Sequence, residues 1–220
     1  MAQVSPSTRH SELEALLVTT QVGLFDDLPT SIDPTFANAQ RIDLDQWSWI
    51  EFVPSWVTGS DRLFRDILRT APWEQRSRWM YTQDVTEPRL TAQYSRTSEA
   101  PQVILREIAA AFTRRYHSGY RSLWMNLYRD EHDSTAWHGD RIGRVTPNCV
   151  VPVLSLGASR RFLIRPLEGG KSMTFHPGAG DLIVMGGRCQ VEWVHSVPKQ
   201  ATPSGARISI NFKPTALRRS

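Results

Sequence analysis

The sequence predicts an α+β protein that is mainly β: a double-stranded β-helix (jelly roll) preceded by N-terminal supporting helices. Two amphipathic helical patterns lie between residues 58 and 116. From residue 122 onward, short alternating runs follow one another, separated by Gly, Pro and Asn, as in consecutive antiparallel strands. A length of 220 residues with 40% hydrophobic residues suits one domain with an extension. These observations predict a single domain whose open end can hold a metal.

Residues 1–28 are predicted to form an N-terminal extension, partly disordered, and residues 29–220 the domain itself. Ser11 can cap a short helix that carries Leu13, Leu16 and Leu17. The N-terminus has no charged region followed by an apolar run and a cleavage site, and no stretch approaches the roughly 20 apolar residues of a membrane helix. We therefore expect a cytoplasmic protein without membrane contact and, by default, a monomer.

The first half of the domain is predicted to contain one strand and two helices. Residues 42–57 are rich in Trp and β-branched residues, which favours a strand ending near Pro54. Thr58-Gly59-Ser60 looks like the cap of a first helix, whose apolar face holds Leu63, Phe64, Ile67 and Leu68. A second helix is predicted for residues 101–116, with Pro101 at its start and Ile104, Ile108 and Phe112 spaced by four.

The second half is predicted to be a succession of short strands with turn residues between them. The candidates are residues 122–128, 148–155, 161–165, 171–175, 181–185, 190–195 and 207–212. Seven or eight such strands after two helices fit the jelly roll.

The charge of the chain favours an anionic partner. The net charge is +4 and the isoelectric point about 9.4, and the 26 basic residues include only three lysines, Lys171, Lys199 and Lys213. Arginine grips phosphate bidentately, so the excess suits nucleic acid, although composition alone is weak support. Cys149 and Cys189 form no CxxC pair, and we expect two reduced, buried thiols.

A candidate metal site begins with Trp137-His138-Gly139-Asp140. His138 and Asp140 are two residues apart, so in an extended segment both side chains project to the same side. His195 is the natural third ligand from a distant strand. Two histidines and one carboxylate leave three positions open, which is the arrangement that non-haem iron(II) oxygenases use. A His-x-Asp pair is common by chance, so by itself it is more often structural; His132 and His176 lack such a pairing and are predicted to be non-ligands.

Two further strands carry polar side chains on one face. In residues 207–213 Arg207, Ser209, Asn211 and Lys213 face one way, whereas Ile208, Ile210 and Phe212 face the core. Asn126 and Tyr128 likewise project together from the strand before the metal motif. A dicarboxylate such as 2-oxoglutarate needs a buried cation for its remote carboxylate, and Arg207 can supply one. The alternative is an exposed polar sheet face.

The order of these motifs resembles the AlkB family of Fe(II)/2-oxoglutarate-dependent dioxygenases over roughly residues 42 to 214. The segments that carry the resemblance are Pro88-Arg89-Leu90-Thr91-Ala92, Asn126-Leu127-Tyr128-Arg129-Asp130, Trp137-His138-Gly139-Asp140, Leu154-Ser155-Leu156-Gly157-Ala158, Gly180-Asp181-Leu182, Trp193-Val194-His195-Ser196-Val197-Pro198-Lys199 and Arg207 to Lys213.

The resemblance implies a set of residue roles. Iron(II) is bound by His138, Asp140 and His195, and 2-oxoglutarate by Asn126, Tyr128, Arg207, Asn211 and Lys213. Lys213 is a departure, because the family commonly has a second arginine there and lysine lacks its fork. Arg141 is another, because relatives acting on DNA often carry an acidic residue after the metal-binding aspartate.

The resemblance also implies the reaction: oxidative demethylation of alkylated DNA or RNA with dioxygen, releasing formaldehyde, succinate and CO2. The base must be flipped or single-stranded to reach the metal. Among Trp79, Met80, Tyr81 and Tyr94, which lie in a stretch with Arg76, Arg78, Arg89 and Arg96, Tyr94 is the preferred stacking residue. Arg89 and Arg141 are predicted substrate contacts. Core packing is an equally good interpretation for each aromatic side chain.

Two alternatives remain open from the residues. One is a 2-oxoglutarate oxygenase acting on a small metabolite or a protein side chain, which keeps the iron site without a nucleic-acid surface. The other is a non-catalytic jelly roll that binds its cation structurally. Succinate formation that depends on dioxygen separates enzyme from binding module, and salt-sensitive binding to methylated oligonucleotide separates the two enzymes.

Overall fold

The structure is a computed structural model, and it describes residues 13, 15–16, 28–80 and 82–215. The predicted extension, residues 1–28, lies almost wholly outside the described residues, as does Leu17. Leu13 and Leu16 pack against the main hydrophobic core. The division between extension and domain stays a prediction.

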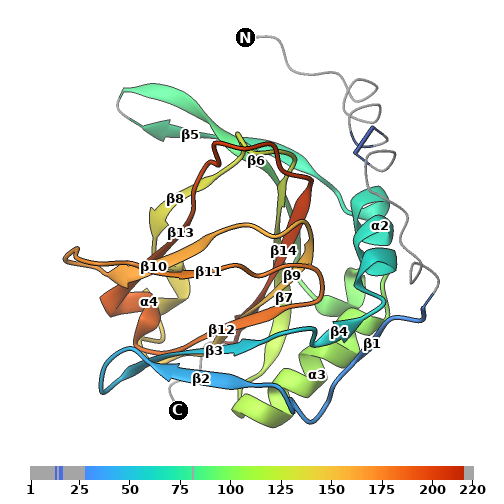
Figure 1. Cartoon of the computed structure of the whole chain (residues 1–220), viewed down its shortest axis with the longest axis horizontal. Helices are drawn as coiled ribbons and strands as arrows, with labels where there is room; N and C mark the ends of the chain where they lie inside the picture. Colours follow the sequence, from blue (N-terminus) through green and yellow to red (C-terminus); the bar gives the residue numbers. More distant parts are fainter. Residues whose placement is uncertain (1–12, 14, 17–27, 81, 216–220) are drawn as a thin grey trace.

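Two antiparallel sheets face each other and form the predicted jelly roll (Figure 1). The large sheet has the order β2-β3-β12-β9-β14-β7-β6-β5 and the small sheet the order β11-β10-β13-β8. The large sheet comprises β2 (Gln40–Asp43), β3 (Ser48–Val53), β12 (Leu182–Gly187), β9 (Val151–Gly157), β14 (Arg207–Pro214), β7 (Tyr120–Tyr128), β6 (Gln83–Tyr94) and β5 (Glu74–Met80). The small sheet comprises β11 (Met173–Phe175), β10 (Phe162–Pro166), β13 (Trp193–Val197) and β8 (Thr135–His138); a separate pair joins β1 (Ser31–Ile32) to β4 (Val57–Thr58).

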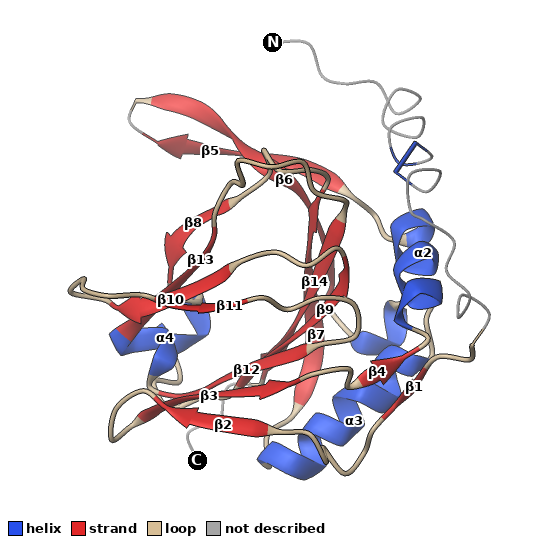
Figure 2. Cartoon of the chain, viewed as in Figure 1, coloured by secondary structure: helices blue, strands red, loops and turns tan. Residues whose placement is uncertain are grey.

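The two long helices cover the outer face of the large sheet (Figure 2). Helix α2 (Ser60–Thr70) begins directly after Gly59, whose φ of 65° lies in the left-handed region, and buries the predicted apolar face. Helix α3 (Ile104–Tyr116) begins three residues after the predicted start at Pro101 and ends at His117 in the left-handed conformation. Both predicted helices are therefore confirmed, with shifted boundaries.

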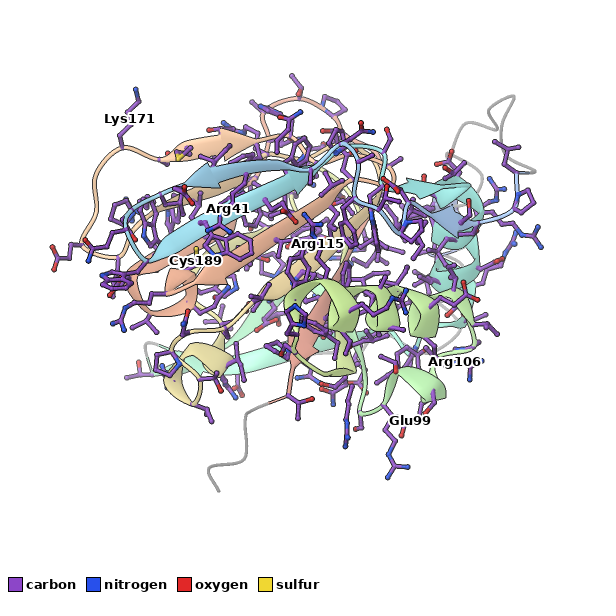
Figure 3. All side chains as sticks on the ribbon, turned by 90° about the horizontal axis from the view of Figure 1, so that it is seen from below. Arg41, Glu99, Arg106, Arg115, Lys171 and Cys189 are labelled. Atoms are coloured by element: carbon purple, nitrogen blue, oxygen red, sulfur yellow. The ribbon has the colours of Figure 1, made fainter. Side chains whose placement is uncertain are left out.

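A half-buried ion pair joins α3 to the large sheet, and Figure 3 labels its arginine, Arg115. Arg115 of α3 donates from Nε and Nη2 to the two carboxylate oxygens of Glu51 in β3, at 3.1 and 2.7 Å. The hydroxyl of Tyr116 donates to the same carboxylate at 2.5 Å. Three donors thus compensate the burial of this carboxylate, which is a condition for an ion pair to be tolerated in the interior.

The alternation along the strands separates two cores. Side chains on the outer face of the large sheet pack under the helices, among them Leu123, Met125, Leu127, Ile208, Ile210 and Phe212. A second core lies between the sheets and includes Ile50, Tyr128, Val151, Phe162, Ile164, Ile183 and Met185. The polar face of β14 therefore points into the space between the sheets, not to solvent, which excludes the exposed-face alternative for Arg207 and Ser209.

The structure corrects two expectations about the strands and adds one hairpin. Residues 42–57 do not form one strand, because Asp45 accepts the backbone N–H groups of Trp47 and Ser48 and closes a turn between β2 and β3. The predicted strand 190–195 begins as a short helix, α4 (Cys189–Glu192), and only its end belongs to β13. The hairpin of β5 and β6 was not predicted, because charged side chains obscure its alternation.

The structure also describes both cysteines and the helices α2, α3 and α4. Cys149 and Cys189 are free and buried, as predicted, and burial raises the pKa of both thiols to about 12. Within the described part of the chain, no helix is long and apolar enough to cross a membrane.

Candidate metal and co-substrate site

The three predicted metal ligands meet at the end of the small sheet. His138 of β8 and His195 of β13 are directly opposite each other in the antiparallel pair, and their ring centroids are 4.3 Å apart. Asp140 follows two residues after His138, and the ligand atoms of all three residues lie within 4.8 Å of one another. Among the described residues, this is the one group of three or more such side chains that could hold a metal ion.

Hydrogen bonding prepares His138 to bind a metal. Its Nδ1 lies 2.9 Å from the carbonyl oxygen of Ala136, and because that oxygen can only accept, Nδ1 carries the proton. The lone pair is then on Nε2, which lies 3.9 Å from Oδ1 of Asp140. Contacts of this kind orient metal-binding histidines.

Burial and neighbouring charge set the protonation of the other two ligands. Burial and the neighbouring His138 hold the pKa of His195 well below its usual range, so this imidazole stays neutral and able to coordinate. Burial raises the pKa of Asp140, and His138 and Lys213 partly oppose this effect. A divalent cation would stabilise the carboxylate form directly.

A short helix holds the loop that carries Asp140. The backbone N–H of Asp140 donates to Oε1 of Gln190 in α4 at 2.7 Å. A Cβ at Gly139 would lie 2.8 Å from the carbonyl oxygen of Gln190, so this close approach requires glycine. Gln190 was not singled out from the sequence, because its contact joins segments 50 residues apart.

The donor set fits iron(II). Two neutral imidazoles and one carboxylate from one side of an ion match the facial arrangement of non-haem iron(II) oxygenases, in which the remaining positions stay open for co-substrate and dioxygen.

A buried guanidinium without a counter-ion marks the predicted co-substrate pocket. Arg207 is 1% exposed, and its Nη2 donates to Oγ of Ser155 at 2.8 Å. Its Nε and Nη1 are buried without a hydrogen-bond partner, and no carboxylate of the described residues forms an ion pair with it. Burial lowers the pKa of Arg207, an effect that the adjacent Tyr128 partly offsets. A carboxylate ligand would supply both missing acceptors.

Asn126 and Tyr128 lie beside this arginine on β7, as predicted. Tyr128 is opposite Arg207, and Asn126 is opposite Ser209. The Tyr128 hydroxyl is 2.8 Å from Oγ1 of Thr135 in β8, so it spans the two sheets. Nδ2 of Asn126 donates to Oγ of Ser209 at 3.1 Å and keeps one further hydrogen for a ligand.

Asn211 and Lys213 lie farther along the same face of β14. Nδ2 of Asn211 donates to the carbonyl oxygen of Trp124 at 3.0 Å. Nζ of Lys213 lies 4.8 Å from the centre of the Trp124 ring, and Asp140 is close enough to favour its charged form against the burial that lowers its pKa. Trp124 is thus a second residue that the sequence did not single out.

Two predicted substrate contacts are corrected by the structure. Tyr94 follows Leu90 and Ala92 on one face of β6 and packs against the main core under the helices, so it does not point to the metal. Arg89 points inward, but it is 8% exposed and forms an ion pair with Glu87 at 3.1 Å. A buried, paired arginine is not placed to contact phosphate.

Arg141 remains as the predicted substrate contact at the rim. It is exposed and begins a short 3₁₀ helix, residues 141–144, directly after Asp140. The side chains of Arg78, Trp79, Met80 and Tyr81 lie outside the described part of the structure.

Arg160 is a further buried arginine that the sequence did not single out. It is 1% exposed, and its terminal nitrogens donate to the carbonyl oxygens of Asp130, Asp133 and Pro198 at 2.5, 2.8 and 3.1 Å. These carbonyls belong to the segments before β8 and after β13, so Arg160 holds the two strands that carry the histidines.

Known proteins are similar to this chain in sequence and in fold. The chain is 31% identical over 176 residues to alpha-ketoglutarate-dependent dioxygenase alkB homolog 3 of Bos taurus, covering 70% of this chain and 61% of the relative. The human protein of that name is 30% identical over 179 residues, covering 71% and 62%. The DNA oxidative demethylase ALKBH2 of Arabidopsis thaliana is 29% identical over 119 residues, covering 44% and 38%. The chain therefore spans about three fifths of the mammalian relatives, and the predicted similarity to AlkB proteins is confirmed.

The fold also has a counterpart among solved structures. The structure of OsALKBH1 matches with a TM-score of 0.58 at 11% identity, covering 80% of this chain and all of that one. A family model described as the 2OG-Fe(II) oxygenase superfamily matches residues 58–213, from β4 through the metal ligands into β14. Because this match takes in most of the chain and every residue of the His138, Asp140 and His195 cluster, the chain belongs to the 2OG-Fe(II) oxygenase superfamily, whose chemistry uses Fe(II), 2-oxoglutarate and dioxygen.

Proposed function

We propose that this protein is a dioxygenase that oxidatively demethylates alkylated nucleic-acid bases. One structural observation carries the oxygenase half of the proposal: a buried arginine with two unpaired donors lies on the sheet opposite the metal-ligand cluster. The substrate half is supported by the similarity to relatives named as AlkB homologues and, in one case, as a DNA oxidative demethylase.

Each part of the pocket has a task in this proposal. His138, Asp140 and His195 hold Fe(II). Arg207 holds the remote carboxylate of 2-oxoglutarate through its two free N–H groups, and Tyr128 beside it closes the pocket between the sheets. The amide of Asn126 donates to the other end of the co-substrate, and Lys213 adds charge there.

The bound iron supplies oxidising power from dioxygen and 2-oxoglutarate, so that an N-methyl group is hydroxylated and lost as formaldehyde while 2-oxoglutarate becomes succinate and CO2. The protein contributes binding and orientation. Burial keeps His195 neutral, and the ring of Phe162 from the second core stacks on it at a centroid distance of 5.5 Å.

Cations at the rim suit a substrate that carries phosphates. Arg141 is exposed directly after the proposed iron ligand Asp140, and the partly exposed Arg76 lies over the ring of Trp124. A methylated base would have to leave its stack to reach the metal, and the phosphates on either side would then lie at this rim.

The test is formaldehyde release from methylated oligonucleotides in the presence of Fe(II), ascorbate and 2-oxoglutarate, with the product masses measured. A panel of single- and double-stranded DNA and RNA carrying different N-methyl bases identifies the substrate. His195→Ala should abolish release, whereas His176→Ala, an exposed histidine outside the site, should not. Release of succinate without demethylation of any oligonucleotide would refute the nucleic-acid substrate and favour a small metabolite or a protein side chain.

A further inference from the structure

Trp124 contacts three of the five residues predicted from the sequence to hold 2-oxoglutarate. Its Nε1 donates to Oδ1 of Asn126 at 3.1 Å, and its carbonyl oxygen accepts from Asn211 at 3.0 Å. The face of its ring lies 4.8 Å from Nζ of Lys213. The indole is half-buried on β7 and shares the inward face of that strand with Asn126.

The indole N–H fixes the orientation of the Asn126 amide. Oδ1 of Asn126 accepts two hydrogen bonds, from Nε1 of Trp124 and from Nε of Arg89 at 2.9 Å. Both partners can only donate, so the amide cannot rotate by half a turn without losing both bonds. Its NH2 group is therefore held toward Ser209 and the pocket, where a carboxylate or keto oxygen needs a donor.

The indole face restrains the ammonium of Lys213. Lysine has a flexible stem and no fork, so its charge needs a second contact to hold one position. The ring supplies that contact, because a cation over an indole face is attracted by the π electrons. Cζ of Arg76 lies 4.5 Å from the centre of the same ring, so the ring is also held from β5, at the edge of the large sheet.

We propose that Trp124 is a positioning residue for 2-oxoglutarate: its N–H orients the Asn126 amide, and its face holds the Lys213 ammonium near the metal cluster. This inference rests on the placement of the co-substrate between Asn126 and Arg207. Trp124 acts through these side chains and needs no contact with the substrate.

The test is calorimetric titration of 2-oxoglutarate into the full chain loaded with Mn(II), which measures binding without turnover. Trp124→Phe keeps the ring face and removes the N–H, and it should weaken 2-oxoglutarate binding about threefold to tenfold, the usual range for one hydrogen bond. Trp124→Leu removes both contacts and should weaken binding further. The matched control is Trp49→Phe. The Trp49 ring lies on the helix-facing side of β3, with its centre 4.4 Å from Cζ of Arg41, so this variant should bind 2-oxoglutarate normally.

A double-mutant cycle separates positioning from general destabilisation. If Trp124 acts through Asn126, then Trp124→Phe should add little to the loss caused by Asn126→Ala. Effects of the two substitutions that multiply, or normal binding by Trp124→Phe, would overturn the inference. Arg207→Met in the same titration tests the placement of the co-substrate. If Arg207→Met binds 2-oxoglutarate normally, that placement is wrong. If Arg207→Met binds weakly and Trp124→Phe binds normally, only the role of Trp124 is refuted. Urea unfolding of each variant without ligand confirms that it is folded. If Trp124→Leu is unfolded, the binding measured for Trp124→Phe alone decides the test.

Discussion

Replacing Arg207 by methionine should have opposite effects on the free and the loaded protein. In the free protein the side chain is a buried cation with two donors that have no partner, and each such donor costs about 1–3 kcal/mol. Methionine removes that cost, and it also removes the hydrogen bond to Ser155, which contributes about 1 kcal/mol. We expect the free variant to be more stable than the original protein, by about 1–5 kcal/mol.

The loaded variant should lose the stabilisation that 2-oxoglutarate provides. Removing one partner of a buried charge pair costs about 2 kcal/mol or more, which raises the dissociation constant about 30-fold or more. A ligand at one hundred times its dissociation constant stabilises a protein by about 2.7 kcal/mol, and after a 30-fold loss of affinity this falls to about 0.9 kcal/mol.

Arg160 provides the matched control for this prediction. It is as buried as Arg207, but its donors reach three carbonyl oxygens, so Arg160→Met should destabilise the protein by about 2–4 kcal/mol with or without 2-oxoglutarate. The assay is urea unfolding of the free proteins and thermal unfolding with Mn(II) and 2-oxoglutarate. If free Arg207→Met is destabilised as much as Arg160→Met, or if 2-oxoglutarate stabilises it fully, Arg207 is a structural residue and the carboxylate binds elsewhere.

Three further predictions concern protonation, packing and substrate. The pKa of His195 is depressed in the folded protein, so its contribution to stability is complete above about pH 6.5 and is lost as the pH falls toward the pKa of the folded state. In urea unfolding of the metal-free protein, the free energy of unfolding should therefore fall between about pH 7.5 and 5.5, and His195→Gln should reduce this fall. Glu51→Gln weakens the contacts to Arg115 and Tyr116 and should lower the free energy of unfolding by about 1–3 kcal/mol, while 2-oxoglutarate affinity, measured on the Mn(II) form, stays unchanged. Arg141→Ala should weaken oligonucleotide binding and reduce the slope of log affinity against log salt by about 1; an unchanged slope would place the phosphates away from this rim.

The sequence alone predicted the fold and the candidate metal ligands, because strand alternation and the two-residue spacing of His138 and Asp140 are local patterns, to which His195 was added from a distant strand. A period of two places Arg207 with Ser209 and Asn126 with Tyr128, and the structure keeps these pairings. The two-residue spacing of His138 and Asp140 puts both on one side of an extended segment regardless of what packs around them. The apolar faces of the two helices were also readable, since their spacing follows the helical period.

The substrate-side residues required the tertiary structure. Alternation shows which residues share a face, but it does not show which face meets the helices and which meets the metal when both faces are covered. Alternation puts Leu90, Ala92 and Tyr94 on one face of β6, but only the structure shows that this face packs against the main core. Arg89 was predicted to contact phosphate because the sequence does not show that it forms an ion pair with Glu87.

The pairing of charges was decided by the tertiary structure as well. Arg160 and Arg207 look alike in the sequence, and both are buried. The two terminal nitrogens of Arg160 reach three carbonyl oxygens and only its Nε has no partner, whereas Arg207 keeps both Nε and Nη1 free. Trp124 touches Asn211 and Lys213 only because β14 pairs with β7 across a separation of more than 80 residues. Local sequence determines which side chains a strand presents, whereas the partners that satisfy a buried charge come from distant segments, and only their packing determines whether a donor is left for a ligand.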